Sequence, residues 1–141
     1  MKLVALLLAT VMSGQAPQFA GIWTGTFEGR PFVVLHLAEQ AGTISGSIHH
    51  STQINTSKDG TLLGVSGSFV DESIADVKIV GNELRFSTQD EDNEDTKYIL
   101  HLSGPETAEL SFADAPVSEV APKPWMLHRG EQPQTELRRK R

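Results

Sequence analysis

The sequence predicts an all-β protein built as one antiparallel up-and-down β-barrel of eight or nine strands. Short segments in which apolar and polar residues alternate recur along the chain, which is typical of strands with one buried face. Turn residues separate these segments at hairpin distances, and no segment has the apolar spacing of an amphipathic helix. Closing such a meander removes both edge strands, so we favour a barrel over a two-sheet sandwich.

The first predicted strand covers residues 20–29. Trp23, Gly25 and Phe27 share one of its faces, and polar residues such as Thr24 and Thr26 share the other. Most of the later strands place their large apolar residues on one face in the same way. They are expected at residues 32–38, 43–49, 61–70, 74–80, 83–88, 96–103, 107–113 and 125–129.

The second of these strands, residues 32–38, is apolar on both faces. Phe32 and Val34 fall on its outward face by alternation. Such a strand is either covered on both sides or exposes an apolar strip. Further along, three prolines within residues 115–124 exclude a central strand there.

The chain of 141 residues is expected to form a single domain between two terminal segments. Residues 1–16 are predicted to be a signal peptide, because Lys2 precedes a ten-residue apolar run and small residues follow it. That run is too short to span a bilayer. Residues 17–130 are the predicted barrel domain, and residues 131–141 a disordered basic tail. We therefore expect a secreted or periplasmic protein with no membrane insertion of the mature chain.

Composition and charge exclude several classes of function. The chain has no cysteine, which rules out disulfides and thiolate chemistry. Its net charge of −6 argues against nucleic acid as a partner.

We expect no enzymatic activity, no cofactor and no metal site. The sequence has neither a Gly-x-Ser-x-Gly elbow nor a phosphate-binding glycine loop. Ligands on one face of a strand are spaced by two, whereas His49 and His50 are adjacent and should point to opposite faces. The acidic run at residues 90–95 lacks the central glycine and distal glutamate of an EF-hand loop.

Gly21 and Trp23 form a Gly-x-Trp sequence that resembles the one opening the first strand of calycins, the superfamily of lipocalins, fatty-acid-binding proteins and avidin-like barrels. The resemblance extends to the strand pattern of residues 20–130. It implies that Trp23 packs across one barrel end against a basic residue of the last strand. Arg129 is the candidate, because it shares the inward parity of Trp125 and Leu127. The chain lacks the disulfide and mid-chain motifs of lipocalins, the helical lid of fatty-acid-binding proteins and the several tryptophans of a biotin site.

The predicted inward-facing residues give the leading functional hypothesis. A barrel of eight strands is either filled by side chains or just wide enough for one small ligand. We expect a small hydrophobic ligand, bound non-covalently at the mouth away from Trp23. The candidate lining residues are Phe27, Leu35, Leu37, Ile48, Val65, Phe69, Phe86, Leu100, Phe112 and Trp125.

The alternative is a filled barrel that acts through its surface, as an inhibitor or as an adhesion or interaction module. Phe32 and Val34 would then form the contact patch.

Overall fold

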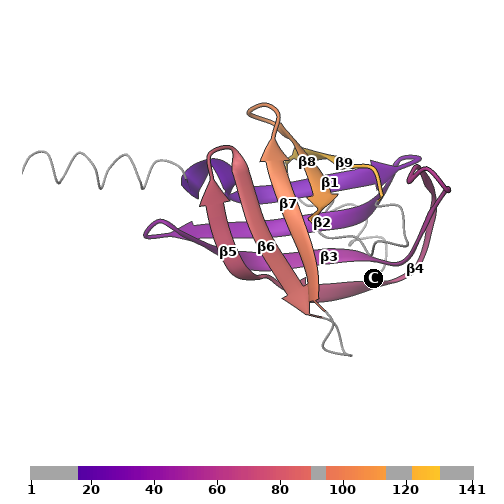
Figure 1. The fold of residues 1–141 in the computed structure, drawn as a ribbon, viewed down its shortest axis with the longest axis horizontal. Coiled ribbons are helices and arrows are strands. Elements are labelled where there is room, and N and C mark those ends of the chain that lie inside the picture. Colours follow the sequence, from indigo (N-terminus) through magenta and orange to yellow (C-terminus); the bar gives the residue numbers. More distant parts are fainter. Residues whose placement is uncertain (1–15, 90–94, 114–121, 131–141) are drawn as a thin grey trace, which may run out of the picture.

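The computed structural model describes residues 16–89, 95–113 and 122–130, and these form one short 3-10 turn followed by nine strands (Figure 1). Most of the predicted signal peptide, most of the acidic run and the whole basic tail lie outside the described residues. The elements are η1 (Ala16–Phe19), β1 (Gly21–Phe27), β2 (Arg30–Gln40), β3 (Thr43–Thr56), β4 (Leu62–Ser73), β5 (Ala75–Val80), β6 (Glu83–Gln89), β7 (Asp95–Leu102), β8 (Thr107–Phe112) and β9 (Trp125–Arg129).

All nine strands belong to one antiparallel sheet, which confirms the predicted all-β class and the up-and-down order. The strands lie in the order β4-β3-β2-β1-β9-β8-β7-β6-β5. Strands consecutive in the chain are therefore neighbours, apart from β4 and β5. The first and last strands also pair, with Trp23 opposite Arg129 and Thr24 opposite His128.

The predicted closure into a barrel is not observed as a hydrogen-bonded ring. β4 and β5 are the two edges of the sheet and share no ladder. The reason is the connection between them, because Ile74 is the single residue that separates the two strands. One residue is too few for a hairpin, whose shortest common loop has two. The chain therefore passes from one edge of the sheet to the other without folding back on itself, and the Ile74 amide donates to the carbonyl of Gly46 on β3.

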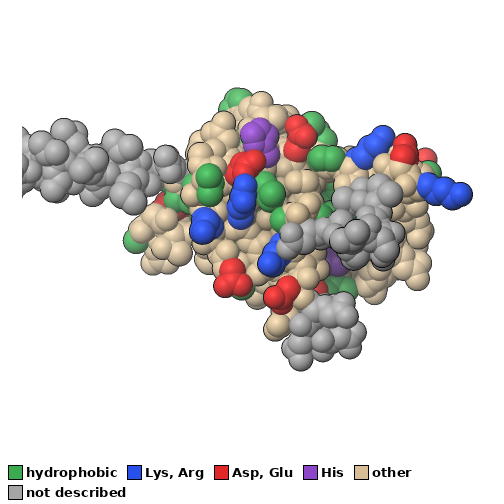
Figure 2. Space-filling view, viewed as in Figure 1, with side chains coloured by type: hydrophobic (Ala, Val, Ile, Leu, Met, Phe, Trp, Pro, Cys, Tyr) green, Lys and Arg blue, Asp and Glu red, His purple; other side chains and the backbone are tan. Residues whose placement is uncertain are grey.

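The sheet curls so that β5, β6 and β7 cross in front of β1–β4 (Figure 1). The core lies between these two parts. On the outer face of β5–β7, acidic and basic side chains are interspersed (Figure 2); Arg85 and Glu83 form an ion pair there at 3.0 Å. The buried core comprises Ala16, Phe19, Trp23, Phe32, Val33, Leu35, Leu37, Ile44, Ile48, Leu84, Phe86, Tyr98, Leu100, Ala108, Leu110, Trp125 and Leu127.

Phe32 and Val34 do not form the exposed patch that alternation predicts. The pairing of β1 with β2 shifts between Gly25 and Thr26, so that Phe32 is the extra residue of a β-bulge. The bulge turns the Phe32 ring into the core, where it is 2% exposed. Val34 is also buried, at 5% exposure.

Phe69 departs from its predicted inward position for a related reason. Gly67 has a φ of 85° and lies where the β3–β4 pairing shifts. This irregularity reverses the alternation along β4, so that Val65 packs against the core while Phe69 is 38% exposed. Its ring stacks on His49 on the outer face, with centroids 4.7 Å apart.

Candidate functional site

Trp23 and Arg129 meet at one end of the core, together with Gly21. The Trp23 ring is fully buried and its Nε1 donates to the carbonyl of Phe19 at 2.9 Å. The guanidinium of Arg129 lies over this ring, 4.3 Å from the centroid. A side chain at position 21 would crowd Arg129, since an added Cβ would lie 3.3 Å from its Nη1.

The guanidinium of Arg129 also donates to three backbone carbonyls, those of Gln18, Ala20 and Pro105. These carbonyls belong to η1, to the residue before β1 and to the β7–β8 turn. Arg129 therefore connects three segments at this end of the sheet. It can do so because its planar guanidinium carries several N–H donors in fixed directions, which the ammonium group of a lysine lacks.

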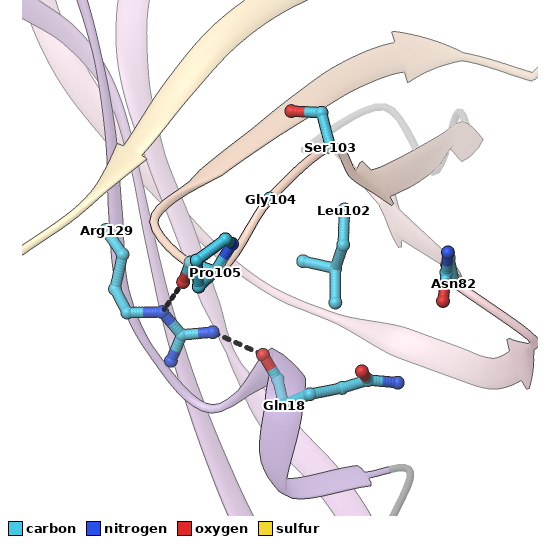
Figure 3. Close-up of a pocket in the computed structure, with 7 residues that line it drawn as sticks. All are labelled: Gln18, Asn82, Leu102, Ser103, Gly104, Pro105 and Arg129. Carbon is cyan, nitrogen blue, oxygen red and sulfur yellow. Dashed lines mark hydrogen bonds between the residues drawn. The ribbon is translucent and has the colours of Figure 1, made fainter.

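An open groove of about 470 Å³ lies beside Arg129 (Figure 3). Its walls combine polar groups with the apolar side chains of Leu102 and Pro105. This groove is at the opposite end from the predicted ligand mouth. The lining residues are Gln18, Asn82, Leu102, Ser103, Gly104, Pro105 and Arg129.

Nine of the ten predicted lining residues divide into two groups, and the tenth, Phe69, lies on the outer face. Those near Trp23 and in the middle of the sheet are buried by other protein atoms and leave no surface for a ligand: Leu35, Leu37, Ile48, Phe86, Leu100 and Trp125. Even the space beside Gly25 is filled, because an added Cβ would lie 2.7 Å from Leu127 and 2.8 Å from Val33.

A second group of inward-facing apolar side chains packs against the core but stays partly exposed. We name these residues the open apolar end. They come from the end of β1, the β3–β4 hairpin and the end of β8, away from Trp23, and three of them were predicted as lining. They are Phe27, Ile54, Leu62, Val65 and Phe112.

A row of aromatic rings leads from the core to the open apolar end. Trp125 lies between Phe32 and Phe112, with centroids 5.1 and 5.3 Å away and both rings edge-on. Phe112 contacts Tyr98, and Tyr98 stacks on Phe86, each at 5.2 Å. Such edge-on and offset contacts add stability beyond the area they bury.

A polar pair lies on the inner wall at the β4 edge. His50 Nε2 is 3.3 Å from Glu72 Oε1, and His50 Nδ1 is 2.9 Å from the carbonyl of Ser51. Both side chains are mostly buried. Glu72 faces inward because it pairs with Ile48, whose side chain is fully buried.

Glu72 of this pair affects the pKa of Tyr98. Burial of the phenol, with a further contribution from the charge of Glu72, raises the pKa of Tyr98 to about 12. Burial disfavours the phenolate because its charge would lose its hydration, and the nearby carboxylate repels it.

The segment that leads into β9 is attached to the β3–β4 turn. The amide of Lys123 donates to the carbonyl of Gly60 at 2.9 Å, and its Nζ lies 3.5 Å from Asp59. Hydrogen bonds from Ser57 and Thr61 hold the pKa of Asp59 well below its usual range. The two attached segments come from strands that are not neighbours in the sheet.

The residues of this region that the sequence did not indicate as lining are Phe32, His50, Ile54, Leu62, Glu72 and Tyr98. Tyr98 shares the inward parity of Leu100, which was a usable signal. Glu72 and His50 are carboxylate and imidazole groups on an inner face, where alternation predicts apolar residues. Alternation from Ile48 already places His50 on the inner face, whereas only the irregularity near Gly67 and the pairing with Ile48 place Glu72 there.

Comparisons of the chain with protein-family models, with curated proteins and with solved structures give no match. None of the described residues form a helix with the length and hydropathy needed to cross a lipid bilayer.

Proposed function

We propose that this protein is a secreted or periplasmic, calycin-like β-barrel that binds a small apolar ligand non-covalently at the open apolar end. The observation that carries the proposal is the contrast between the two ends of the interior. The side chains around Trp23 are sealed, whereas Phe27, Val65 and Phe112 face inward and remain partly exposed. Inward-facing apolar surface that stays partly exposed favours an apolar ligand.

The packing of Arg129 on Trp23 supports the calycin resemblance, because it joins the first and last strands at one end of the sheet. In the barrel we propose, β4 and β5 lie next to each other at a seam without hydrogen-bonded pairing. The ligand binds at the open apolar end, away from Trp23 and Arg129. The surface-acting alternative loses its contact patch, since Phe32 and Val34 are buried.

Titration with N-phenyl-1-naphthylamine, a neutral probe that fluoresces in apolar sites, tests the proposal. We expect saturable binding that Phe27→Ser and Val65→Thr each weaken by about tenfold, the loss expected for roughly 50 Å² of apolar contact. Leu102→Ser is the matched control, because Leu102 is also a partly buried apolar residue but lies at the other end.

Equal weakening by all three variants, with melting curves that show each is folded, would place the probe elsewhere. No saturable binding to the wild-type protein would refute the proposal outright.

A further inference from the structure

The groove beside Arg129 combines a cationic group with space for a small molecule. Its volume of about 470 Å³ is in the usual range of ligand sites. Among the described residues of its lining, Arg129 is the one that carries a charge. In the described part of the chain, no carboxylate lies within ion-pair distance of the guanidinium. The positive charge at this groove is therefore not neutralised by a described side chain.

The guanidinium also keeps an N–H donor for a ligand. It has five N–H groups, and three of them donate to the carbonyls of Gln18, Ala20 and Pro105. Nη2 carries two hydrogens, one of which is parallel to Nε–H in the planar group. In Figure 3 the Gln18 carbonyl lies on the side of Nη2 away from Pro105. The N–H of Nη2 that is parallel to Nε–H therefore points into the groove, toward Leu102.

The other lining residues supply apolar contact and polar side chains. Leu102 lies between Arg129 and Asn82, and Pro105 lies beside the guanidinium (Figure 3). The Leu102 amide donates to the carbonyl of Asn82 at 3.0 Å, which holds these two parts of the wall together. The Gln18 side chain extends from η1 toward Asn82. A molecule with an anionic group at Arg129 would therefore place an apolar body on Leu102.

The carboxylates next to the lining residues in the sequence do not oppose an anion in the groove. Glu83 follows Asn82, but its carboxylate is paired with Arg85 at 3.0 Å. Glu106 follows Pro105, and its exposed side chain is not part of the lining. One guanidinium neutralises one negative charge. A carboxylate with a single charge therefore fits this groove better than a phosphate group, which carries nearly two.

We propose that the groove binds a small organic carboxylate with an apolar body. The carboxylate accepts a charge-assisted hydrogen bond from Nη2 of Arg129, and the apolar body packs on Leu102 and Pro105. This site is separate from the open apolar end, so the inference goes beyond the proposed function and does not depend on it.

Three probes test the two parts of such a ligand: 3-phenylpropionate, its neutral amide 3-phenylpropanamide, and acetate. In a ¹H–¹⁵N NMR titration we expect 3-phenylpropionate to shift the backbone amide signals of Ser103 and Gly104, which line the groove. It should bind about three to ten times more tightly than the amide, the advantage of one charge-assisted hydrogen bond at a partly exposed site. Acetate should bind more weakly than 3-phenylpropionate, because it lacks the apolar body.

Gln18→Glu is the test variant, because Gln18 is exposed and the change adds a carboxylate to the groove while Arg129 keeps its structural contacts. We expect it to weaken binding of 3-phenylpropionate about fivefold, with little effect on the amide. Asn82→Asp should act in the same direction. Gln53→Glu is the matched control, since Gln53 is exposed on β3 and is not part of the lining. Melting curves show that each variant is folded.

Equal affinities of 3-phenylpropionate and its amide, or equal losses in Gln18→Glu and Gln53→Glu, would overturn the anionic group. Acetate binding as tight as that of 3-phenylpropionate would overturn the apolar body. No shift of the Ser103 and Gly104 signals at millimolar 3-phenylpropionate would overturn the site itself. None of these results changes the binding of N-phenyl-1-naphthylamine at the open apolar end, so the proposed function is tested separately.

Discussion

Arg129 holds one end of the molecule through geometry that only a guanidinium supplies. It donates to three carbonyls from separate segments and stacks on Trp23. Arg129→Lys keeps the charge but loses the planar set of donors, so we expect a loss of about 1–3 kcal/mol in the free energy of unfolding. Urea denaturation measures the loss.

Arg85→Lys is the control for that substitution, because Arg85 is exposed and pairs only with Glu83 in the described structure. It should change the free energy of unfolding by less than about 0.5 kcal/mol. If Arg129→Lys were equally mild, Arg129 would not act as the connection between the three segments.

Tyr98 gives a second prediction, because it is the only tyrosine in the chain and its absorbance can be followed alone. Its pKa is raised from 10.0 to about 12 in the folded protein. Below pH 10 the phenol is protonated in both states and stability is unaffected. Between pH 10 and pH 12 the unfolded chain ionises first, so stability should fall, by up to about 3 kcal/mol.

Absorbance at 295 nm should therefore show a phenolate midpoint near pH 12 while circular dichroism still reports a folded protein. Tyr98→Phe should remove most of the stability loss above pH 10. A phenolate midpoint near 10 in the folded state would show that Tyr98 is neither desolvated nor close to Glu72.

At the level of single residues, the sequence predicted the Trp23–Arg129 contact but misplaced two aromatic side chains. Strict alternation puts Phe32 outside and Phe69 inside, and the structure has them the other way round. Each error lies beside a β-bulge, which reverses the faces of all residues beyond it. Gly67 was the one sign of a bulge in the sequence. A glycine within a strand can also mark a bend or a close approach of another backbone, so it does not by itself predict a bulge.

Among the strands, β2 and β3 approach each other closely at Gly46. A Cβ built there would lie 1.8 Å from the carbonyl oxygen of His36, and the residue has a φ of 152°. Backbone atoms cannot move aside as side chains can, so Gly46→Ala should cost about 3 kcal/mol in the free energy of unfolding. Thermal denaturation measures this as a clear fall in melting temperature.

Gly64→Ala is the matched control on β4, where an added Cβ meets no atom within 4 Å. It should leave the melting temperature nearly unchanged. Comparable losses at both positions would mean that the strain at Gly46 does not depend on the close approach of β2.

The unpaired edges of β4 and β5, which form the seam of the molecule, should affect the hydrogen exchange of their amides. β1 is paired on both sides, whereas β4 and β5 each have one neighbour. About half of the amides in β4 and β5 therefore lack a ladder partner and should exchange with deuterium much faster than those of β1. Protection of every amide of β4, to the level seen in β1, would show that the seam is closed in solution.

For the whole molecule, the sequence predicted the class and order of the strands because alternation and turn signals are local. It did not predict the open seam, because Ser73, Ile74 and Ala75 look like any strand boundary in the sequence. Whether two strands joined by one residue pair with each other depends on the curl of the entire sheet. The partly open interior is likewise a property of packing, which no single segment determines.

The pairing of β1 with β9 also has consequences for how the chain folds. Two local meanders, β1–β4 and β5–β9, meet at this ladder. Beside it the guanidinium of Arg129 donates a hydrogen bond to the carbonyl of Ala20, which lies 109 positions earlier in the sequence. Bringing such distant segments together carries a large loop-closure entropy and slows folding. A circularly permuted chain that begins at Ala75, with residues 130 and 16 joined by a linker, would instead run through the sheet from edge to edge. Every ladder would then join strands that are consecutive in the chain, and we expect such a variant to fold faster.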